Sequence, residues 1–193
     1  KIEAHHEVLE GQGSLELAVE AAQKAIARSG VNKEEIDLVI SCSVTKMSGD
    51  LQNLIEPCLA SHICTALDIK AQNFDIANAC LGMVTGILIA DRKIRSGKIR
   101  HALIVAGEYL TEALYEALGK NLLFNQKAFS SLTIGDAGGA YVVSGSDEER
   151  IQFHEPMTLA QHSQVCIGDG AVGRAGPALR TDGKTLPNAA RET

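Results

Sequence analysis

The sequence predicts an α/β domain whose mostly parallel sheet is covered by helices on both faces. Residues 36–43 and 101–107 are short apolar, β-branched runs, typical of buried parallel strands, and residues 71–77 predict a third strand. Segments with apolar residues at helical spacing separate these strands. Such alternation predicts parallel strands side by side with helices packed over them. At 193 residues, 45% of them hydrophobic, the chain is long enough for one sizeable domain.

The first helix is predicted over residues 14–29. Ser14 can cap its amino end, its apolar residues recur at helical spacing, and Gly30 stands at the position favoured just after a helix. Further along, Pro57 fits the first position of a second helix, over residues 57–66, because it would break a helix that had begun earlier. The segment before Pro57 is therefore expected to be a loop.

The third helix, over residues 81–95, is apolar on almost every side, which predicts a buried helix. Gly82 and Gly86 lie four residues apart on it, where they lower helix propensity but let a neighbouring backbone come close. A fourth helix is expected at residues 109–118 and a last strand at residues 140–144.

Two glycine-rich segments carry little periodicity. Residues 135–139 are expected to form the turn before the last strand. From about residue 168 onward the chain is rich in Gly, Ala and Pro, which predicts either an ordered flap or a loose tail.

The charge distribution argues against a nucleic-acid-binding domain. The net charge is -6, and 24 acidic and 18 basic residues are spread along the chain, whereas a nucleic-acid surface needs clustered Lys and Arg. The first residues have neither the layout of a secretion signal nor the length of a membrane span. We therefore expect neither a nucleic acid nor a membrane as a partner.

Metal and disulfide chemistry is not indicated. The five cysteines are an odd number without a CxxC pair, which argues against a zinc site or a disulfide framework and predicts a reducing, cytoplasmic location. The six histidines have no metal-ligand spacing, so no metal site is expected, and only His154 lies near a plausible active-site rim. The cysteines are Cys42, Cys58, Cys64, Cys80 and Cys166; the histidines are His5, His6, His62, His101, His154 and His162.

The most informative stretch is residues 74–83, in which Cys80 stands between a predicted strand and the amino end of a buried helix. Free backbone N–H groups and the helix dipole at such a position favour a thiolate, as a nucleophilic thiol requires. The alternative for the same position is a buried cysteine that acts only as a small hydrophobe.

Two motifs in this order resemble ketoacyl-ACP synthase III, a branch of the thiolase superfamily. The first is the strand, the Ala-Cys-x-Gly turn around Cys80 and the apolar helix that follows. The second is Ile-Gly-Asp-Ala-Gly-Gly-Ala at residues 134–140. Segments from Ser14 to Val105 also match in order, so the resemblance covers about residues 2–160.

The resemblance implies a thiolase-like fold, with a five-stranded mixed sheet between helices as one half of an αβαβα sandwich. Residues 1–160 would form the amino-terminal half-domain, and residues 161–193 a flap or connector toward a carboxy-terminal half that this chain lacks. Family members are usually homodimers, so a homodimer is expected as well.

The resemblance also implies a reaction. Cys80 would attack an acyl thioester, usually of coenzyme A, with its own backbone N–H as one donor of the oxyanion hole. The acyl-cysteine would then condense with a malonyl group on acyl carrier protein as carbon dioxide is lost. No cofactor is implied beside the substrates acyl-CoA and malonyl-ACP. The implied setting is fatty-acid or polyketide-type biosynthesis.

Further residues receive roles by the same resemblance. The segment of Gly135, Asp136, Gly138 and Gly139 would be a structural turn near the site, whose glycines permit tight backbone conformations. Asp136 is expected to cap that turn rather than to act as an acid.

Two departures from the family pattern bear on the substrates. Asn78 and Leu81 stand where the family more often has small residues, so they are expected to contact the substrate and to alter acyl specificity. The family's catalytic His and Asn belong to the carboxy-terminal half, and no segment here matches their motifs.

Two alternative functions stay open at this point. One is a non-catalytic thiolase-fold subunit that binds acyl chains or an active partner, with Cys80 left as a relic. The other is a thiolase or a hydroxymethylglutaryl-CoA synthase, which shares the nucleophile and differs in the second substrate.

Overall fold

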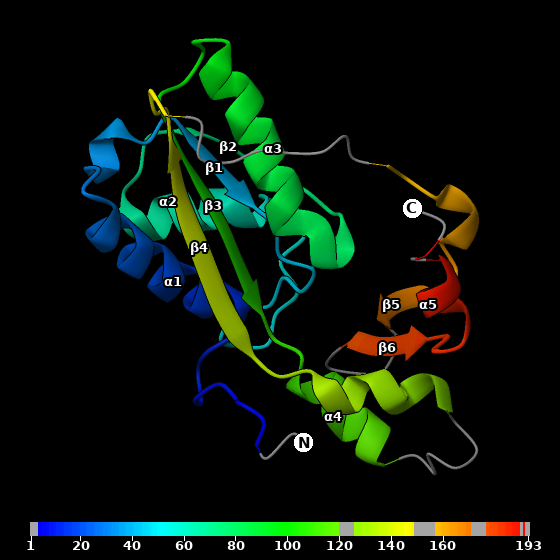
Figure 1. Cartoon of the computed structure of the whole chain (residues 1–193). Helices are drawn as coiled ribbons and strands as arrows, with labels where there is room; N and C mark the ends of the chain where they lie inside the picture. The colour runs from blue at the N-terminus through cyan, green and yellow to red at the C-terminus, as the bar shows by residue number, and fades with distance from the viewer. Residues whose placement is uncertain (1–3, 120–125, 149–156, 171–176, 190, 192–193) are drawn as a thin grey trace. The chain divides into compact units, whose positions relative to one another are not determined.

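The computed structural model describes residues 4–119, 126–148, 157–170, 177–189 and 191 (Figure 1). The chain packs as two compact units whose segments alternate along the sequence. The sheet unit comprises Val8–Tyr109 and Ala137–Gln152; the appended unit comprises Lys1–Glu7, Leu110–Asp136 and Phe153–Thr193. The proposed boundary at residue 160 stays a prediction about the longer protein.

The sheet unit is built on strands in the order β2-β1-β3-β4. β1 (Leu38–Ser41) is parallel to β2 (Gln72–Asp75) on one side and to β3 (His101–Glu108) on the other, and β4 (Ala137–Ser144) is antiparallel to β3. The α/β class and the mixed sheet are thus confirmed.

The expected count of five strands is wrong for the described residues, which place four strands in this sheet. The fifth strand was implied by the resemblance alone, whereas the sequence itself contains four strand-like runs. Of the chain that follows β4, residues 149–156 lie outside the described part and residues 157–159 form no strand.

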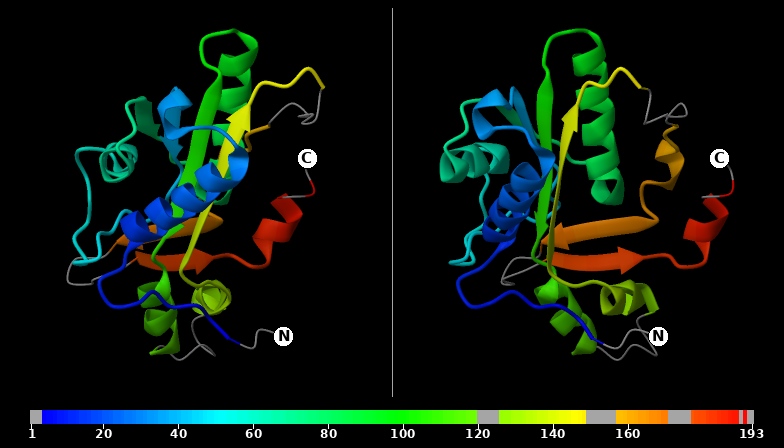
Figure 2. Two further views of the ribbon diagram at one scale, coloured as in Figure 1. Left: turned by 90° about the vertical axis from the view of Figure 1, so that its left-hand side faces the viewer. Right: turned by 60° about the vertical axis from the view of Figure 1, so that its left-hand side comes forward.

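Helices cover both faces of this sheet, as predicted (Figure 1 and Figure 2). α1 (Ser14–Ser29) and α2 (Leu59–Leu67) pack on one face, and α3 (Gly82–Arg95) packs on the other. Because side chains alternate along a strand, β1 sends Val39 into the first core and Ile40 into the second. Short 3₁₀ helices lie at Lys33–Glu35 (η1) and Ala79–Leu81 (η2).

Two glycines let α1 lie directly on the sheet. Gly107 and Gly138 are opposite one another in β3 and β4. A Cβ at Gly107 would be 2.0 Å from the carbonyl oxygen of Ser14, and one at Gly138 would be 2.3 Å from that of Leu17. The turn predicted over residues 135–139 is therefore partly wrong, because β4 already begins at Ala137. Gly138 is needed because α1 approaches β4 closely there, not because the backbone adopts an unusual angle.

α3 is buried on one side rather than all round. Its small residues Gly82, Gly86 and Ala90 are buried against the sheet, and a Cβ at Gly86 would be 2.7 Å from Cγ2 of Ile104. Val84, on another side of the helix, is 45% exposed. The apolar sequence predicted full burial, but the sheet of this chain covers only the face that carries the small residues.

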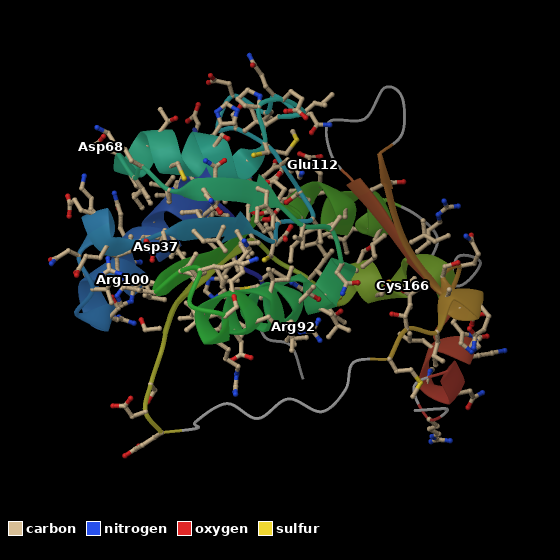
Figure 3. All side chains as sticks on the ribbon, turned by 90° about the horizontal axis from the view of Figure 1, so that it is seen from above. Asp37, Asp68, Arg92, Arg100, Glu112 and Cys166 are labelled. Carbon is tan, nitrogen blue, oxygen red and sulfur yellow. The ribbon has the colours of Figure 1, made fainter. Side chains whose placement is uncertain are left out.

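The starts of β1 and β3 are tied together by one carboxylate. Asp37 accepts hydrogen bonds from the backbone N–H groups of Arg100, at 2.7 Å, and His101, at 3.2 Å (Figure 3). The bond from Arg100 holds the pKa of Asp37 below its usual value, against a smaller opposing effect of burial. This contact fixes the register of the two parallel strands at the edge away from Cys80.

The appended unit contains the remaining elements. They are α4 (Thr111–Leu118), η3 (Gln126–Thr133), η4 (Ala160–His162), β5 (Cys166–Gly170), β6 (Pro177–Thr181) and α5 (Thr185–Ala189). β5 and β6 form a two-stranded antiparallel sheet, so the described part of the glycine-rich end has regular secondary structure. Its role as a flap or connector stays a prediction. Among the helices of the described residues, none has the length and apolar character to cross a membrane.

Candidate active site

Cys80 lies in η2, the 3₁₀ turn that joins the end of β2 to the amino end of α3, as the sequence predicted. The chain leaves the sheet at Ile76, whose N–H donates to the carbonyl oxygen of Ser41 at 2.9 Å. The residues at positions 77–81 are all exposed, Cys80 among them. Cys80 is therefore open to a reactant, just before α3 begins. The N–H groups of Leu81 and Gly82 donate within the turn, to the carbonyl oxygens of Asn78 and Ala79.

Hydrogen bonds fix the shape of this turn. The N–H of Leu81 donates to the carbonyl oxygen of Asn78 at 3.0 Å, and Nδ2 of Asn78 donates to Oγ1 of Thr85 at 2.7 Å. Oγ1 of Thr85 donates in turn to the carbonyl oxygen of Leu81 at 3.0 Å. Between them Ala79 has a φ of 43°, in the left-handed region.

Beneath the turn lies the end of β1. A Cβ at Gly82 would be 3.0 Å from the carbonyl oxygen of Cys42 and 3.2 Å from its Cβ, so α3 begins in direct contact with this residue. Burial, reinforced by the charges of Asp75 and Glu108, raises the pKa of the Cys42 thiol to about 12. Cys42 therefore fills the floor of the site as a neutral thiol.

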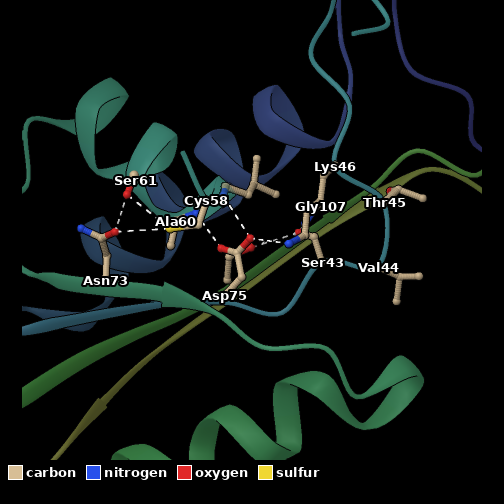
Figure 4. Close-up of polar contacts among 12 residues, drawn as sticks. Ser43, Val44, Thr45, Lys46, Cys58, Ala60, Ser61, Asn73, Asp75 and Gly107 are labelled. Atoms are coloured by element: carbon tan, nitrogen blue, oxygen red, sulfur yellow. Dashed lines mark hydrogen bonds and ion pairs between the residues drawn. The ribbon is translucent and has the colours of Figure 1, made fainter. Parts of the chain in front are cut away.

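Asp75, the last residue of β2, joins three segments at the carboxyl edge of the sheet (Figure 4). Its Oδ2 lies 2.6 Å from Nζ of Lys46 and accepts the N–H of Leu59 at 3.0 Å, while its Oδ1 accepts the N–H of Ala60 at 2.9 Å. α2 consequently begins at Leu59 instead of at the predicted Pro57, because the carboxylate caps these two N–H groups. A cap supplied by a distant strand leaves no local sequence signal.

Glu108, the last residue of β3, holds the loop that follows β1. Its carboxylate accepts the N–H of Val44 at 2.7 Å, the N–H of Thr45 at 2.9 Å and the hydroxyl of Thr45 at 2.8 Å. Burial raises the pKa of Glu108, and these three bonds partly oppose the shift. Neither acidic strand end was predicted from the sequence. Glu108 directly follows an apolar run, which was an available signal, whereas Asp75 follows the mostly polar residues 72–74.

The remaining cysteines have different surroundings. Cys64 is buried, and burial raises the pKa of its thiol to about 11. Cys58 is half-buried, with its Sγ 3.3 Å from Oγ of Ser61 and 3.6 Å from Oδ1 of Asn73. Cys166 is exposed in the appended unit (Figure 3). Cys80 and Cys166 are therefore the accessible thiols.

The segment that follows η3 contributes to α4 and β4. The buried carboxylate of Asp136 accepts the N–H groups of Leu110, at 2.6 Å, and Thr111, at 2.9 Å, and the Thr111 hydroxyl at 2.6 Å. It therefore caps the amino end of α4 and is fully engaged there. Gly135 lies near the backbone of His6.

Gly138 and Gly139 are strand residues that face opposite sides of the sheet. Gly138 contacts α1, whereas a Cβ at Gly139 would lie 3.8 Å from Sδ of Met83 in α3. Their contacts thus serve helix packing on both faces of the sheet. Of the predicted site residues, Asn78 and Leu81 are the ones nearest to Cys80 in the sequence.

Two of the described histidines make hydrogen bonds to segments other than the Cys80 turn. Nδ1 of His5 lies 2.8 Å from the carbonyl oxygen of Ile134, and Nδ1 of His101 lies 2.8 Å from Oγ of Ser144. His154, which the sequence placed near a site rim, lies outside the described residues. In the part of the chain that is described, no group of three or more His, Cys, Asp or Glu residues is arranged to hold a metal ion.

Comparison with known proteins agrees with this geometry. The family model for 3-oxoacyl-[acyl-carrier-protein (ACP)] synthase III matches residues 74–161, which include the Cys80 turn and β4. The chain is 34% identical over 140 residues to the β-ketoacyl-[acyl-carrier-protein] synthase III of Clostridium perfringens, an alignment that covers 72% of this chain. The enzyme of the same name from Acholeplasma laidlawii is 31% identical over 147 residues, covering 74% of this chain.

Similar solved structures include OleA of Xanthomonas campestris with bound lauric acid and lauroyl-CoA. That structure is 25% identical in sequence and has a TM-score of 0.82 over 99% of this chain. OleA with bound cerulenin is 26% identical, with a TM-score of 0.83 over the whole of this chain.

The chain spans only part of each of these proteins: 38% of the Clostridium perfringens enzyme, 42% of the Acholeplasma laidlawii enzyme and 57% of the OleA chain. The mixed sheet with helices on both faces, the cysteine at the amino end of α3 and the sequence similarity all indicate the same relationship. The chain belongs to the ketoacyl-ACP synthase III-like family, in the thiolase superfamily.

Proposed function

We propose that the protein containing this chain is an acyltransferase that forms a carbon–carbon bond through an acyl-Cys80 intermediate. The observation that carries the proposal is an exposed cysteine at the amino end of α3, in a chain with the fold and sequence of ketoacyl-ACP synthase III. The dipole of α3 favours negative charge at this end of the helix, such as that on the oxyanion of acyl transfer.

The reaction has two steps. The Cys80 sulfur, as thiolate, attacks the carbonyl carbon of an acyl-CoA; the tetrahedral oxyanion collapses, the C–S bond to coenzyme A breaks, and the CoA thiol leaves. A malonyl thioester on acyl carrier protein then loses carbon dioxide, and the carbanion so formed attacks the acyl-cysteine. A new carbon–carbon bond forms as the C–S bond to Cys80 breaks and returns the thiol. The groups that move protons in these steps belong to the part of the protein beyond this chain.

A long-chain acyl-CoA is the proposed acyl donor. The structural relative OleA has been seen with lauric acid and lauroyl-CoA. In this chain the side chains of Leu81 and Val84, next to Cys80, are 61% and 45% exposed and offer an apolar surface. We assign acyl carrier protein as the second partner, a homodimer as the working assembly, the cytoplasm as the location, and fatty-acid or polyketide-type synthesis as the setting.

The test is acyl transfer to the complete protein. Incubation with lauroyl-CoA, followed by proteolysis and mass mapping, should add one lauroyl group to the peptide that contains Cys80. Cys80→Ala should abolish the adduct, whereas Cys166→Ala, at the other exposed thiol, should leave it intact. A wild-type protein that stays unmodified at Cys80 while folded would contradict the proposal and favour a non-catalytic subunit.

A further inference from the structure

The turn that carries Cys80 is closed by a pair of polar side chains. Nδ2 of Asn78, just before the turn, donates to Oγ1 of Thr85, in the first turns of α3, at 2.7 Å. The same Oγ1 donates its own proton to the carbonyl oxygen of Leu81 at 3.0 Å. One hydroxyl therefore accepts from one side of Cys80 and donates to the other.

A bond from a helical threonine to the carbonyl four residues earlier is common and needs no special role. The link from Asn78 is different, because it crosses the turn and joins the segment after β2 to the body of α3. Together with the backbone bond from Leu81 to Asn78, at 3.0 Å, it encloses Ala79 and Cys80 in a ring of hydrogen bonds.

The enclosed backbone needs such support. Ala79 has a φ of 43°, a left-handed conformation that costs a residue with a Cβ about 1–2 kcal/mol. Without the link, relaxation of Ala79 toward an ordinary conformation would rotate the next peptide group, which is the N–H of Cys80. Thr85 is half-buried on the helix, so it offers a fixed anchor for the exposed side of the turn.

We propose that Asn78 and Thr85 are positioning residues that hold the thiol and the N–H of Cys80 in the orientation required for acyl transfer; the acyl-transfer part of this proposal rests on the function proposed above. The contact between Asn78 and the substrate that the sequence suggested stays a prediction. In the structure the amide N–H of Asn78 donates to Thr85, a residue that the sequence did not mark.

The experiment uses small changes in the complete protein. Thr85→Val replaces the hydroxyl by a methyl group of similar size, and Thr85→Ser keeps the hydroxyl. In single-turnover acylation with lauroyl-CoA, Thr85→Val and Asn78→Ala should each slow acylation about tenfold, with the half-saturating concentration of lauroyl-CoA unchanged within about twofold. Thr85→Ser should stay within about twofold of wild type. The double variant Asn78→Ala, Thr85→Val should be no slower than the slower single variant, because both changes break one link.

Thermal unfolding separates orientation from folding, since all variants should melt within about 3 °C of wild type. An unchanged acylation rate in Thr85→Val, or a loss that Thr85→Ser fails to restore, would overturn the proposal. If wild-type protein accepts no acyl group, the proposed function fails by itself. The rate of Cys80 alkylation by iodoacetamide then still decides the positioning role: a change of threefold or more in Thr85→Val that Thr85→Ser reverses supports it, and equal rates in all three proteins refute it.

Discussion

The five cysteines of this chain differ in how readily a reagent can reach them. Cys42 is buried against α3 and Cys64 is a buried residue of α2, and burial raises the pKa of their thiols to about 12 and about 11. Cys58 is half-buried, whereas Cys80 and Cys166 are exposed. Of the two exposed thiols, Cys80 stands at the amino end of a 14-residue helix, while Cys166 begins a strand.

Brief treatment with iodoacetamide at a pH of about 8 should therefore label Cys80 first. Cys166 should react more slowly, because exposure alone does not favour its thiolate. Cys42 and Cys64 should stay unlabelled, since their thiols remain protonated and covered. Mass mapping over a time course measures all five rates in one sample. Labelling of Cys166 at the same rate as Cys80 would show that the helix end has no effect on reactivity.

The pKa of Glu108 predicts how the stability of the fold depends on pH. Its folded-state pKa is raised above 4.5, mainly by burial, so the folded protein binds this proton more tightly than the unfolded chain does. The stability that this group contributes is present at acidic pH and is lost as the pH rises through its folded pKa. In Glu108→Gln that dependence should be absent, so the stability of wild type relative to the variant should fall as the pH rises from about 4.

At neutral pH the same variant should still be less stable than wild type, by about 1–3 kcal/mol, because the amide of Gln cannot accept all three bonds from Val44 and Thr45. Urea unfolding at a series of pH values measures both effects. A difference between the two proteins that does not vary with pH would contradict the assigned pKa shift.

The packing of α1 on the sheet depends on glycine in adjacent strands. Gly138→Ala should destabilise the fold by about 1–3 kcal/mol, because its Cβ would meet the carbonyl of Leu17 at 2.3 Å. Gly139→Ala is the matched control: it is the next residue of the same strand, and its Cβ would meet only Sδ of Met83 at 3.8 Å. Urea unfolding of both variants gives the comparison. Equal losses would mean that general strand propensity, rather than contact with α1, decides the effect.

The elements of the sheet unit were largely predictable from the sequence. α1 matched its predicted limits, and Gly30 follows its end as expected. The predicted cap was wrong: Gly13 is the N-cap residue, its N–H donates to Glu16, and the hydroxyl of Ser14 lies 2.9 Å from that of Thr45. The start of α2 was predicted two residues early, because its cap, Asp75, comes from another strand. β4 was predicted to start too late, since the glycines that admit α1 resemble a turn in the sequence.

The site was predictable only in part. The position of Cys80 follows from a predicted strand and an apolar helix, both of which are local patterns. The contacts of Lys46 and Glu108 were not predictable, because each joins residues that only the fold brings together. The bond between Asn78 and Thr85 is local, but it depends on the shape of the turn between them. The expectation that α3 is buried all round failed for the same reason: hydrophobicity alone does not say whether the covering surface belongs to the same chain.

For the molecule as a whole, residues 1–193 alone should neither condense substrates nor behave as a well-folded monomer. Leu81, Val84 and Ile55 are 61%, 45% and 76% exposed in this chain, and such apolar surface promotes association. Size-exclusion chromatography and a condensation assay with acyl-CoA and malonyl-ACP test this. A monomer that unfolds cooperatively, or measurable condensation, would show that the chain is self-sufficient.

The segments of the two units alternate along the chain. The interruption of the sheet unit between β3 and β4 is useful for protein engineering. Glu108 and Ala137, the residues on either side of the excursion through α4 and η3, face each other as the last pair of the β3–β4 ladder. Residues 110–136 are thus topologically an insertion at a hairpin, and a two-residue turn such as Asn-Gly has the reach and the twist to join the same strands. A minimal scaffold that keeps Cys80 and its supporting residues is therefore accessible by replacing a loop, without any circular permutation or new strand order.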